Sequence, residues 1–231
     1  MFSRAHHQRI AQVLSLLNAP LLRDHDCLFG GGTAIALRFG EYRESVDMDF
    51  MVSNVANYGK LRALLSGAEG IAPIFIQGQQ LVSQQRDVRA DQYGIRTVLA
   101  LAEQPIKLEI ILEARVALEP PAAENQLCGV ATLTLLDMAT TKLLANSDRW
   151  ADDAVFNRDL IDLAMMQPSK KLLLQAVSKA SSAYGDSVVR DLNAAVNRVL
   201  TRQGWLERCM QALSITTPKA VIWDRIQSLA Q

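Results

Sequence analysis

The sequence has few cysteines, few aromatic residues and no long apolar run. Its 231 residues include three cysteines and 6% Phe, Trp and Tyr. Cys27, Cys128 and Cys209 are far apart and odd in number, which excludes a disulfide framework or a zinc motif and is typical of a reducing compartment. No apolar run approaches the roughly 20 residues of a membrane span, and the N-terminus lacks a signal-peptide pattern. We therefore expect a cytoplasmic protein with no membrane partner.

The sequence also has no net charge, although its charged residues are unevenly distributed along the chain. The 24 Lys and Arg residues balance 24 Asp and Glu residues. Residues 165–231 hold nine basic and four acidic residues, a net charge of +5, so residues 1–164 carry −5. A basic tail can hold an anionic partner, but Lys and Arg on the solvated faces of a helical bundle give the same pattern.

The hydrophobic pattern divides the chain into a mixed first part and a helical second part. Alternation at period two predicts a strand over 46–52, and β-like runs follow at 81–88, 95–101 and 106–112. Helical spacing predicts a first helix that stops near Pro20 and further helices over 33–38 and 58–65. Later helices are expected at 134–147, 152–166, 169–184, 187–201, 204–213 and 218–230. We predict an α+β fold with a mixed β-sheet core over 1–132 and a C-terminal helical bundle over 133–231.

A glycine-rich turn lies between the first short apolar run and a helix. Phe29 is followed by Gly30, Gly31 and Gly32, and Thr33 can then cap the helix. Glycines let a ligand approach the backbone, and a helix N-terminus offers N–H groups to phosphate. Such turns are common between strands and helices, so this motif alone is weak evidence for a phosphate site.

Paired acids on a strand form the second feature. Asp47 and Asp49 are two residues apart, so a strand places both on one face. Two adjacent carboxylates repel each other unless a cation lies between them, and oxygen ligands of this kind suit Mg²⁺ or Mn²⁺. Most isolated Asp-x-Asp pairs are simply solvated acids. Glu109, on the run 106–112, could join the pair from a neighbouring strand or be a lone exposed acid.

Taken together, the run GGGTAIALRFGEYRESVDMDF resembles the first motif of DNA polymerase β-type nucleotidyltransferases, and more closely that of the AbiEii/AbiGii nucleotidyltransferase toxin family. The matching residues are Gly31, Gly32, Thr33, Arg43, Ser45, Asp47, Asp49 and Phe50. The downstream segment LTLLDMATTKLLANSDRWADDAVFNRDLIDL is similar to the family's lysine helix and its Arg-Asp-x-x-Asp-Leu helix. The residues in those positions are Lys142, Arg149, Arg158, Asp159, Asp162 and Leu163.

The resemblance covers about residues 26–164 and implies a nucleotidyltransferase-type core, with residues 133–164 completing the active site. It implies that Asp47, Asp49 and Glu109 hold Mg²⁺ or Mn²⁺, although the superfamily more often has aspartate at the position of Glu109. The implied catalytic residues are Asp47, Asp49, Lys142 and Asp159, and Asp162 fits the last position as well. The residues implied to bind the nucleoside triphosphate (NTP) are Gly31, Gly32, Thr33, Arg43 and Lys142.

The activity implied by the resemblance is transfer of a nucleotide from an NTP to an acceptor hydroxyl by the toxin of a bacterial toxin–antitoxin pair. A cognate antitoxin is then a further partner. The basic C-terminal helices favour an RNA 3′ end, tRNA above all, over a protein hydroxyl as acceptor. Two alternatives stay open: an inactive nucleotide- or partner-binding protein on the same fold, and a small-molecule nucleotidyltransferase of the antibiotic-modifying type.

Overall fold

The computed structural model describes residues 2–230, which fall into two compact units. The first unit comprises Met1–Ala34 and Val46–Thr134, and the second comprises Ile35–Ser45 and Leu135–Gln231. All the strands described lie in the first unit, and the second is helical. The predicted α+β class is confirmed. The segment 35–45, which the sequence assigned to the first part, clusters with the helical unit.

The first unit is built on a mixed sheet with the strand order β1-β2-β6-β5-β3, in which β4 also pairs with β5. Neighbours are antiparallel except for β2 and β6, which run parallel. A separate hairpin is formed by β7 and β8. The strands are β1 (Leu28–Gly30), β2 (Met48–Val52), β3 (Val82–Gln84), β4 (Arg89–Ala90), β5 (Gly94–Leu101), β6 (Gln104–Leu112), β7 (Gln126–Leu127) and β8 (Val130–Ala131).

The two faces of this sheet differ in burial because side chains alternate along each strand. On one face Met48, Phe50, Leu108 and Ile110 are fully or almost fully buried. The intervening residues of β2 and β6 are only partly buried, Asp49 and Glu109 among them. The polar face is therefore the one on which the sheet can present chemistry.

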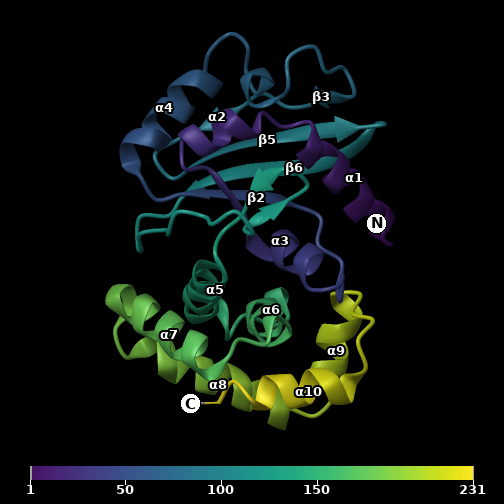
Figure 1. The fold of residues 1–231 in the computed structure, drawn as a ribbon. Helices are drawn as coiled ribbons and strands as arrows, with labels where there is room; N and C mark the ends of the chain where they lie inside the picture. Colours follow the sequence, from purple (N-terminus) through teal and green to yellow (C-terminus); the bar gives the residue numbers. More distant parts are fainter. Residues whose placement is uncertain (1, 231) are drawn as a thin grey trace. The chain divides into compact units, whose positions relative to one another are not determined.

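Four short helices accompany the sheet. They are α1 (Ala5–Ser15), α2 (Ala19–Asp24), α4 (Val55–Leu65) and the 3₁₀ turn η1 (Ala72–Ile74). The apolar faces of α1 and α4 are buried through residues such as Val13 and Leu61, and α4 packs against β2 (Figure 1). Helix α3 (Gly31–Arg38) begins in the first unit and ends in the second.

Several predicted boundaries in the first unit were wrong. Helix α1 ends at Ser15, and Pro20 lies in the first turn of α2, where its missing N–H costs nothing. The strand predicted from Val46 begins at Met48, and Val46 is 46% exposed. Helix α3 starts at Gly31, so Thr33 lies inside its first turn and does not cap it.

In the second unit, α5 and α6 lie at the centre and the later helices form an arc around them (Figure 1). The helices are α5 (Leu135–Arg149), α6 (Arg158–Met166), α7 (Lys170–Tyr184), α8 (Ser187–Thr201), α9 (Trp205–Ala212) and α10 (Lys219–Gln227). The helix predicted over 152–166 is interrupted, because Phe156 and Asn157 adopt left-handed φ angles of 52° and 46° after the turn η2 (Asp153–Val155). Among the described residues, no helix is long and apolar enough to span a bilayer.

Candidate active site

The glycine turn lies directly against the acid pair. Gly30 pairs with Asp49 in the β1–β2 register, and Gly31 follows with a φ of +67°. A Cβ on Gly31 would lie only 2.8 Å from the Cβ of Asp49, so both the backbone angle and the close approach require glycine here. Thr33 is 1% exposed, and its hydroxyl donates to the carbonyl oxygen of Asp47 at 2.5 Å. The start of α3 is thereby fixed against β2 and the residue that precedes it.

A row of cross-strand neighbours extends from the glycine turn to the far edge of the sheet. Asp49 pairs with Glu109 between β2 and β6, Glu109 pairs with Arg96 on β5, and Arg96 pairs with Arg89 on β4. We call these residues, with Gly30, the cross-strand row. Directly paired residues point to the same face, so the row places acids on β2 and β6 and bases on β5 and β4 side by side on one face. The predicted position of Glu109 beside Asp49 is confirmed.

Glu109 is engaged by a cation. The Nε of Arg96 donates to Oε1 of Glu109 at 2.5 Å, and Nη1 of Arg96 reaches Oδ2 of Asp91 at 3.2 Å. Burial opposes the charge on Arg96, but these two carboxylates raise the pKa of its guanidinium. The sequence did not point to Arg96 as a functional residue.

The acid pair has the donor set of a divalent cation site. Asp47 and Asp49 are half-buried carboxylates beside a glycine whose missing Cβ leaves room at Asp49, and carboxylate oxygens are the ligands that Mg²⁺ and Mn²⁺ prefer. Within residues 2–230, no three or more His, Cys, Asp and Glu side chains are gathered as a ready metal site. Glu109 would have to leave Arg96 to join the pair, so its role as a ligand stays a prediction.

A cleft of about 450 Å³ opens beside Asp47 in the first unit. We call it the Asp47 cleft. Its lining carries two acids and four basic side chains, and the residues are Val46, Asp47, Arg86, Asp87, Arg89, Arg96, Thr97, Val98, Pro105 and Lys107. Its size lies within the usual range for ligand sites. The basic side chains come from β4, β5, β6 and the segment between β3 and β4.

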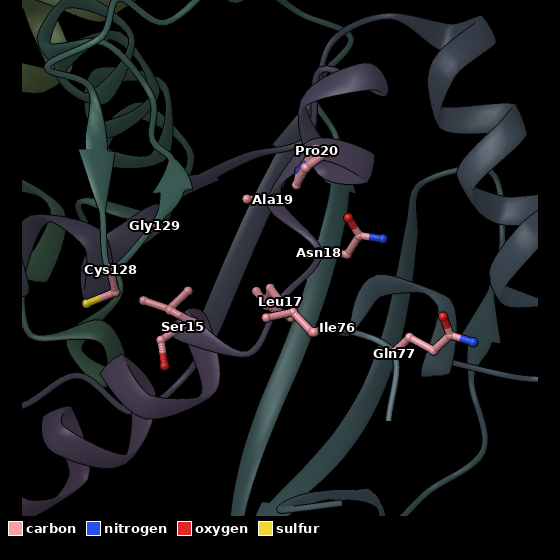
Figure 2. Close-up of a pocket in the computed structure, with 10 residues that line it drawn as sticks. Ser15, Leu17, Asn18, Ala19, Pro20, Ile76, Gln77, Cys128 and Gly129 are labelled. Atoms are coloured by element: carbon pink, nitrogen blue, oxygen red, sulfur yellow. The ribbon is translucent and has the colours of Figure 1, made fainter. Parts of the chain in front are cut away.

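Figure 2 shows a second hollow in the first unit, of about 510 Å³, between the α1–α2 connection and the turn of the β7–β8 hairpin. None of its described lining residues is charged; they include Leu17, Asn18, Ile76 and Cys128. Burial raises the pKa of the Cys128 thiol, so the hollow offers neither a carboxylate nor a ready thiolate. It lacks the groups that phosphoryl transfer requires.

The downstream motif forms a buried ion network in the second unit. Lys142 is 6% exposed, and its Nζ lies 2.9 Å from Oδ1 of Asp159 and 2.7 Å from Oδ2 of Asp162. Arg43 binds Asp162 through two N–H groups at 2.6 and 2.9 Å. Arg149 binds Asp159 in the same bidentate way at 2.7 and 3.0 Å. The two predicted alternatives for the second-motif acid therefore lie on either side of one lysine.

Charge pairing outweighs burial in this network. Burial raises the pKa of Asp159 and Asp162, but Lys142 and the two arginines hold the pKa of both carboxyls below the ordinary value. The same carboxylates raise the pKa of Lys142 despite its burial. Tyr42 donates its hydroxyl to Oδ1 of Asp162 at 2.6 Å, and burial and this carboxylate raise the phenol's pKa. The network holds three cations and two anions, an excess of one positive charge.

Many basic residues of the C-terminal helices have acidic partners within their own unit. Arg198 and Arg202 both bind Asp153, and the Arg202 guanidinium also lies 4.2 Å from the ring centre of buried Trp205. Further ion pairs join Lys179 to Asp137, Arg190 to Asp191 and Lys219 to Glu207. The net charge of +5 in this part of the sequence therefore overstates the charge that is open to a partner.

A glycine turn beside two acids, one on β2 and one directly before it, on a mixed sheet followed by helices, is typical of the nucleotidyltransferase class. The chain belongs to the family described as the nucleotidyl transferase AbiEii toxin of type IV toxin–antitoxin systems, which it matches over residues 15–223. The family resemblance predicted from the two motifs is confirmed. The protein is accordingly a nucleotidyltransferase of a toxin family, and the family implies a nucleotide substrate and an antitoxin partner.

Solved structures show more distant likenesses. A Helicobacter pylori protein provisionally described as a nucleotidyltransferase has 17% identity and a TM-score of 0.49, over 97% of this chain and 93% of that one. JHP933 from Helicobacter pylori has 17% identity and a TM-score of 0.44, over 100% and 94%. The Megavirus polyadenylate synthase has 12% identity and a TM-score of 0.33, over 83% and 37%. No curated protein matches the sequence. The assignment therefore rests on the family match.

Proposed function

We propose that this enzyme transfers a nucleotide from an NTP to the 3′ hydroxyl of an RNA, with tRNA the preferred acceptor, and that it requires Mg²⁺ or Mn²⁺. The observation that supports the proposal is that Asp49 pairs with the glycine turn while Asp47, two residues before it, lines the Asp47 cleft. We place the activity in the cytoplasm, where NTPs and tRNA are found.

The reaction defines what this chain's residues must do. The acceptor oxygen bonds to the α-phosphorus, the bond from that phosphorus to the pyrophosphate oxygen breaks, and one proton is released. Asp47 and Asp49, joined by Glu109 once it leaves Arg96, would hold the metal, which when bound supplies positive charge to the phosphate oxygens. The backbone N–H groups at Gly31 and Gly32, at the start of α3, would bind the β- and γ-phosphates.

Arg43 and Lys142 are proposed to bind the triphosphate, and Lys142 and Asp159 are proposed to act in catalysis. The network that contains them carries one excess positive charge, which is the sign that a triphosphate requires. Lys142→Ala should lower kcat/KM for the NTP at least tenfold, about 1.4 kcal/mol. The assay is run well below the melting temperature of the variant, so that loss of fold does not contribute. Unchanged kinetics would return Lys142 to a purely structural role.

The acceptor can be identified directly. The purified protein is incubated with each of the four NTPs, labelled at the α-phosphate, and with cell extract, and the product is divided between nuclease and protease treatment. We expect label that nuclease removes and protease does not, since RNA is the proposed acceptor. Asp49→Asn should give no label, and Asp24→Asn, the same change at an exposed position in the same unit, should label like the wild type.

Each other outcome points to a different function. Label that survives nuclease and is lost with protease would make the acceptor a protein. Label confined to small molecules would support the antibiotic-modifying type. An absence of label with every NTP and extract would favour a binding protein on this fold.

A further inference from the structure

The cross-strand row separates two sides of Asp49. Gly30 and the glycine turn lie on the β1 side, and Glu109, Arg96 and Arg89 follow on the other side. In phosphoryl transfer the attacking and leaving oxygens lie roughly in line on opposite sides of the phosphorus. If the pyrophosphate leaves at the glycine turn, as the proposed function has it, the acceptor must approach from the side of β6, β5 and β4. That side contains the Asp47 cleft.

Three cations that line this one cleft have no carboxylate partner within the described part of the chain. Among residues 2–230, Arg86, Arg89 and Lys107 have no carboxylate partner, and all three are exposed. Like charges that converge on one cleft repel each other unless an anion lies among them. The acid Asp87 also lines the cleft, and Arg96 is already shared between Glu109 and Asp91. The three unpartnered cations are therefore the groups available to a ligand.

The backbone holds these cations in place. The N–H of Gln85 donates to the carbonyl of Val98 at 2.8 Å, and the hydroxyl of Thr97 donates to the carbonyl of Arg86 at 2.6 Å. Arg89 belongs to β4 and is paired with Arg96. Both arginines are thus anchored on the edge of β5. Strands lie about 4.8 Å apart, so Arg89 is about 14 Å from Asp49 along the row, a span that requires a ligand with successive anionic groups.

We propose that Arg86, Arg89 and Lys107 bind the backbone phosphates of the single-stranded 3′ end of the acceptor RNA and lead its terminal hydroxyl to the acids. This rests on the proposed function for the position of the reaction. Backbone phosphates explain the residue types, because Lys and Arg neutralise phosphates without reading sequence. A protein acceptor presents a hydroxyl without a chain of phosphates and gives no reason for three unpartnered cations.

The test measures RNA binding without NTP, so that it does not depend on transfer. A fluorescent single-stranded RNA of about 12 nucleotides, within the usual site size, is titrated with the full-length protein at several salt concentrations. Each phosphate contact with a single strand contributes about 0.7 to the slope of log K against log salt. The triple variant Arg86→Gln, Arg89→Gln, Lys107→Gln should make that slope shallower by about 2 and weaken binding at least tenfold.

Matched variants separate position from total charge. Lys170→Gln with Lys171→Gln removes two exposed cations from the start of α7 and should leave the slope within error of the wild type, whereas Arg86→Gln with Arg89→Gln should reduce it. Arg86→Lys with Arg89→Lys keeps the charges and should restore binding. An unchanged slope in the triple variant, or an equal loss in the Lys170 and Lys171 variant, would overturn the proposal.

Two further readouts show which proposal has failed. The affinity of the triple variant for a fluorescent NTP should equal that of the wild type; a loss of NTP affinity with RNA binding intact would make the cleft a triphosphate site. If the wild type and the triple variant label RNA equally well, this binding surface is rejected and the proposed function stands. If the wild type labels only protein, both the RNA acceptor and this binding surface are rejected.

Discussion

The two units use charged residues in opposite ways. In the second unit, Asp159 and Asp162 are buried and fully engaged by Lys142 and two arginines. In the first unit, acidic and basic side chains lie partly or fully exposed at the sheet, and three cations of the Asp47 cleft have no acidic partner among the described residues. Buried charges that are already paired gain little free energy from a ligand, whereas exposed like charges are stabilised when a ligand of opposite charge binds among them. The carboxylates of the second unit already have their cationic partners, whereas the unpartnered cations of the first unit are open to a further anionic ligand.

The largest expected effect comes from breaking the buried network. Asp162→Asn removes the carboxylate that Arg43 and Lys142 share and leaves uncompensated buried charge, which should cost about 3 to 5 kcal/mol of unfolding free energy. Urea unfolding measures it, with Asp224→Asn, an exposed acid of the same unit, as control. A loss below about 1 kcal/mol, the usual size for a surface pair, would mean that the network does not hold the fold together.

A second variant tests the close packing in the first unit. Gly31→Ala forces an L side chain into a left-handed φ and against Asp49, so we expect a loss of about 1 to 3 kcal/mol in unfolding free energy and a marked loss of transfer. Gly59→Ala, within α4 with open space at its Cβ, is the control and should stabilise slightly. Wild-type transfer by Gly31→Ala would separate the glycine turn from the reaction.

A smaller and graded effect is expected on acidification. The folded-state pKa values of Asp159 and Asp162 are depressed, so the stability they contribute is present above the unfolded value of about 3.9 and is lost as pH falls below it. Urea midpoints measured from pH 6 down to pH 3 should fall most steeply below about pH 4. The fall should be shallower in Asp162→Asn; equal slopes in the two proteins would contradict the paired network.

The sequence was sufficient to predict the strands that are marked by a pattern within a few neighbouring residues. Period-two alternation located β2, and a β-like run located β6. The sequence alone could not show which side chain binds the carboxylate of Glu109. The register of β5 and β6 depends on a two-residue turn at Ala102 and Glu103, both with positive φ, and these residues are not the Asn-Gly type that marks such turns. Arg96 therefore could not be aligned with Glu109 in advance.

The buried network was also beyond sequence reasoning. Arg43 and Asp162 are 119 residues apart, and their pairing depends on tertiary packing within the second unit. Lys142, taken from the motif as a residue that meets the triphosphate, is buried between two carboxylates. The motif identified the residues, whereas only the structure could show what each side chain touches.

Nucleotide transfer by Asp49→Asn, measured in single turnover with Mg²⁺ and RNA beside the wild type and Asp24→Asn, tests whether the acids of the first unit carry the reaction. We expect a loss of at least a thousandfold, about 4 kcal/mol of transition-state stabilisation, at an unchanged melting temperature. Asp24→Asn should retain the wild-type rate. Transfer by Asp49→Asn at the wild-type rate would contradict the assignment of the reaction to the acids of the first unit.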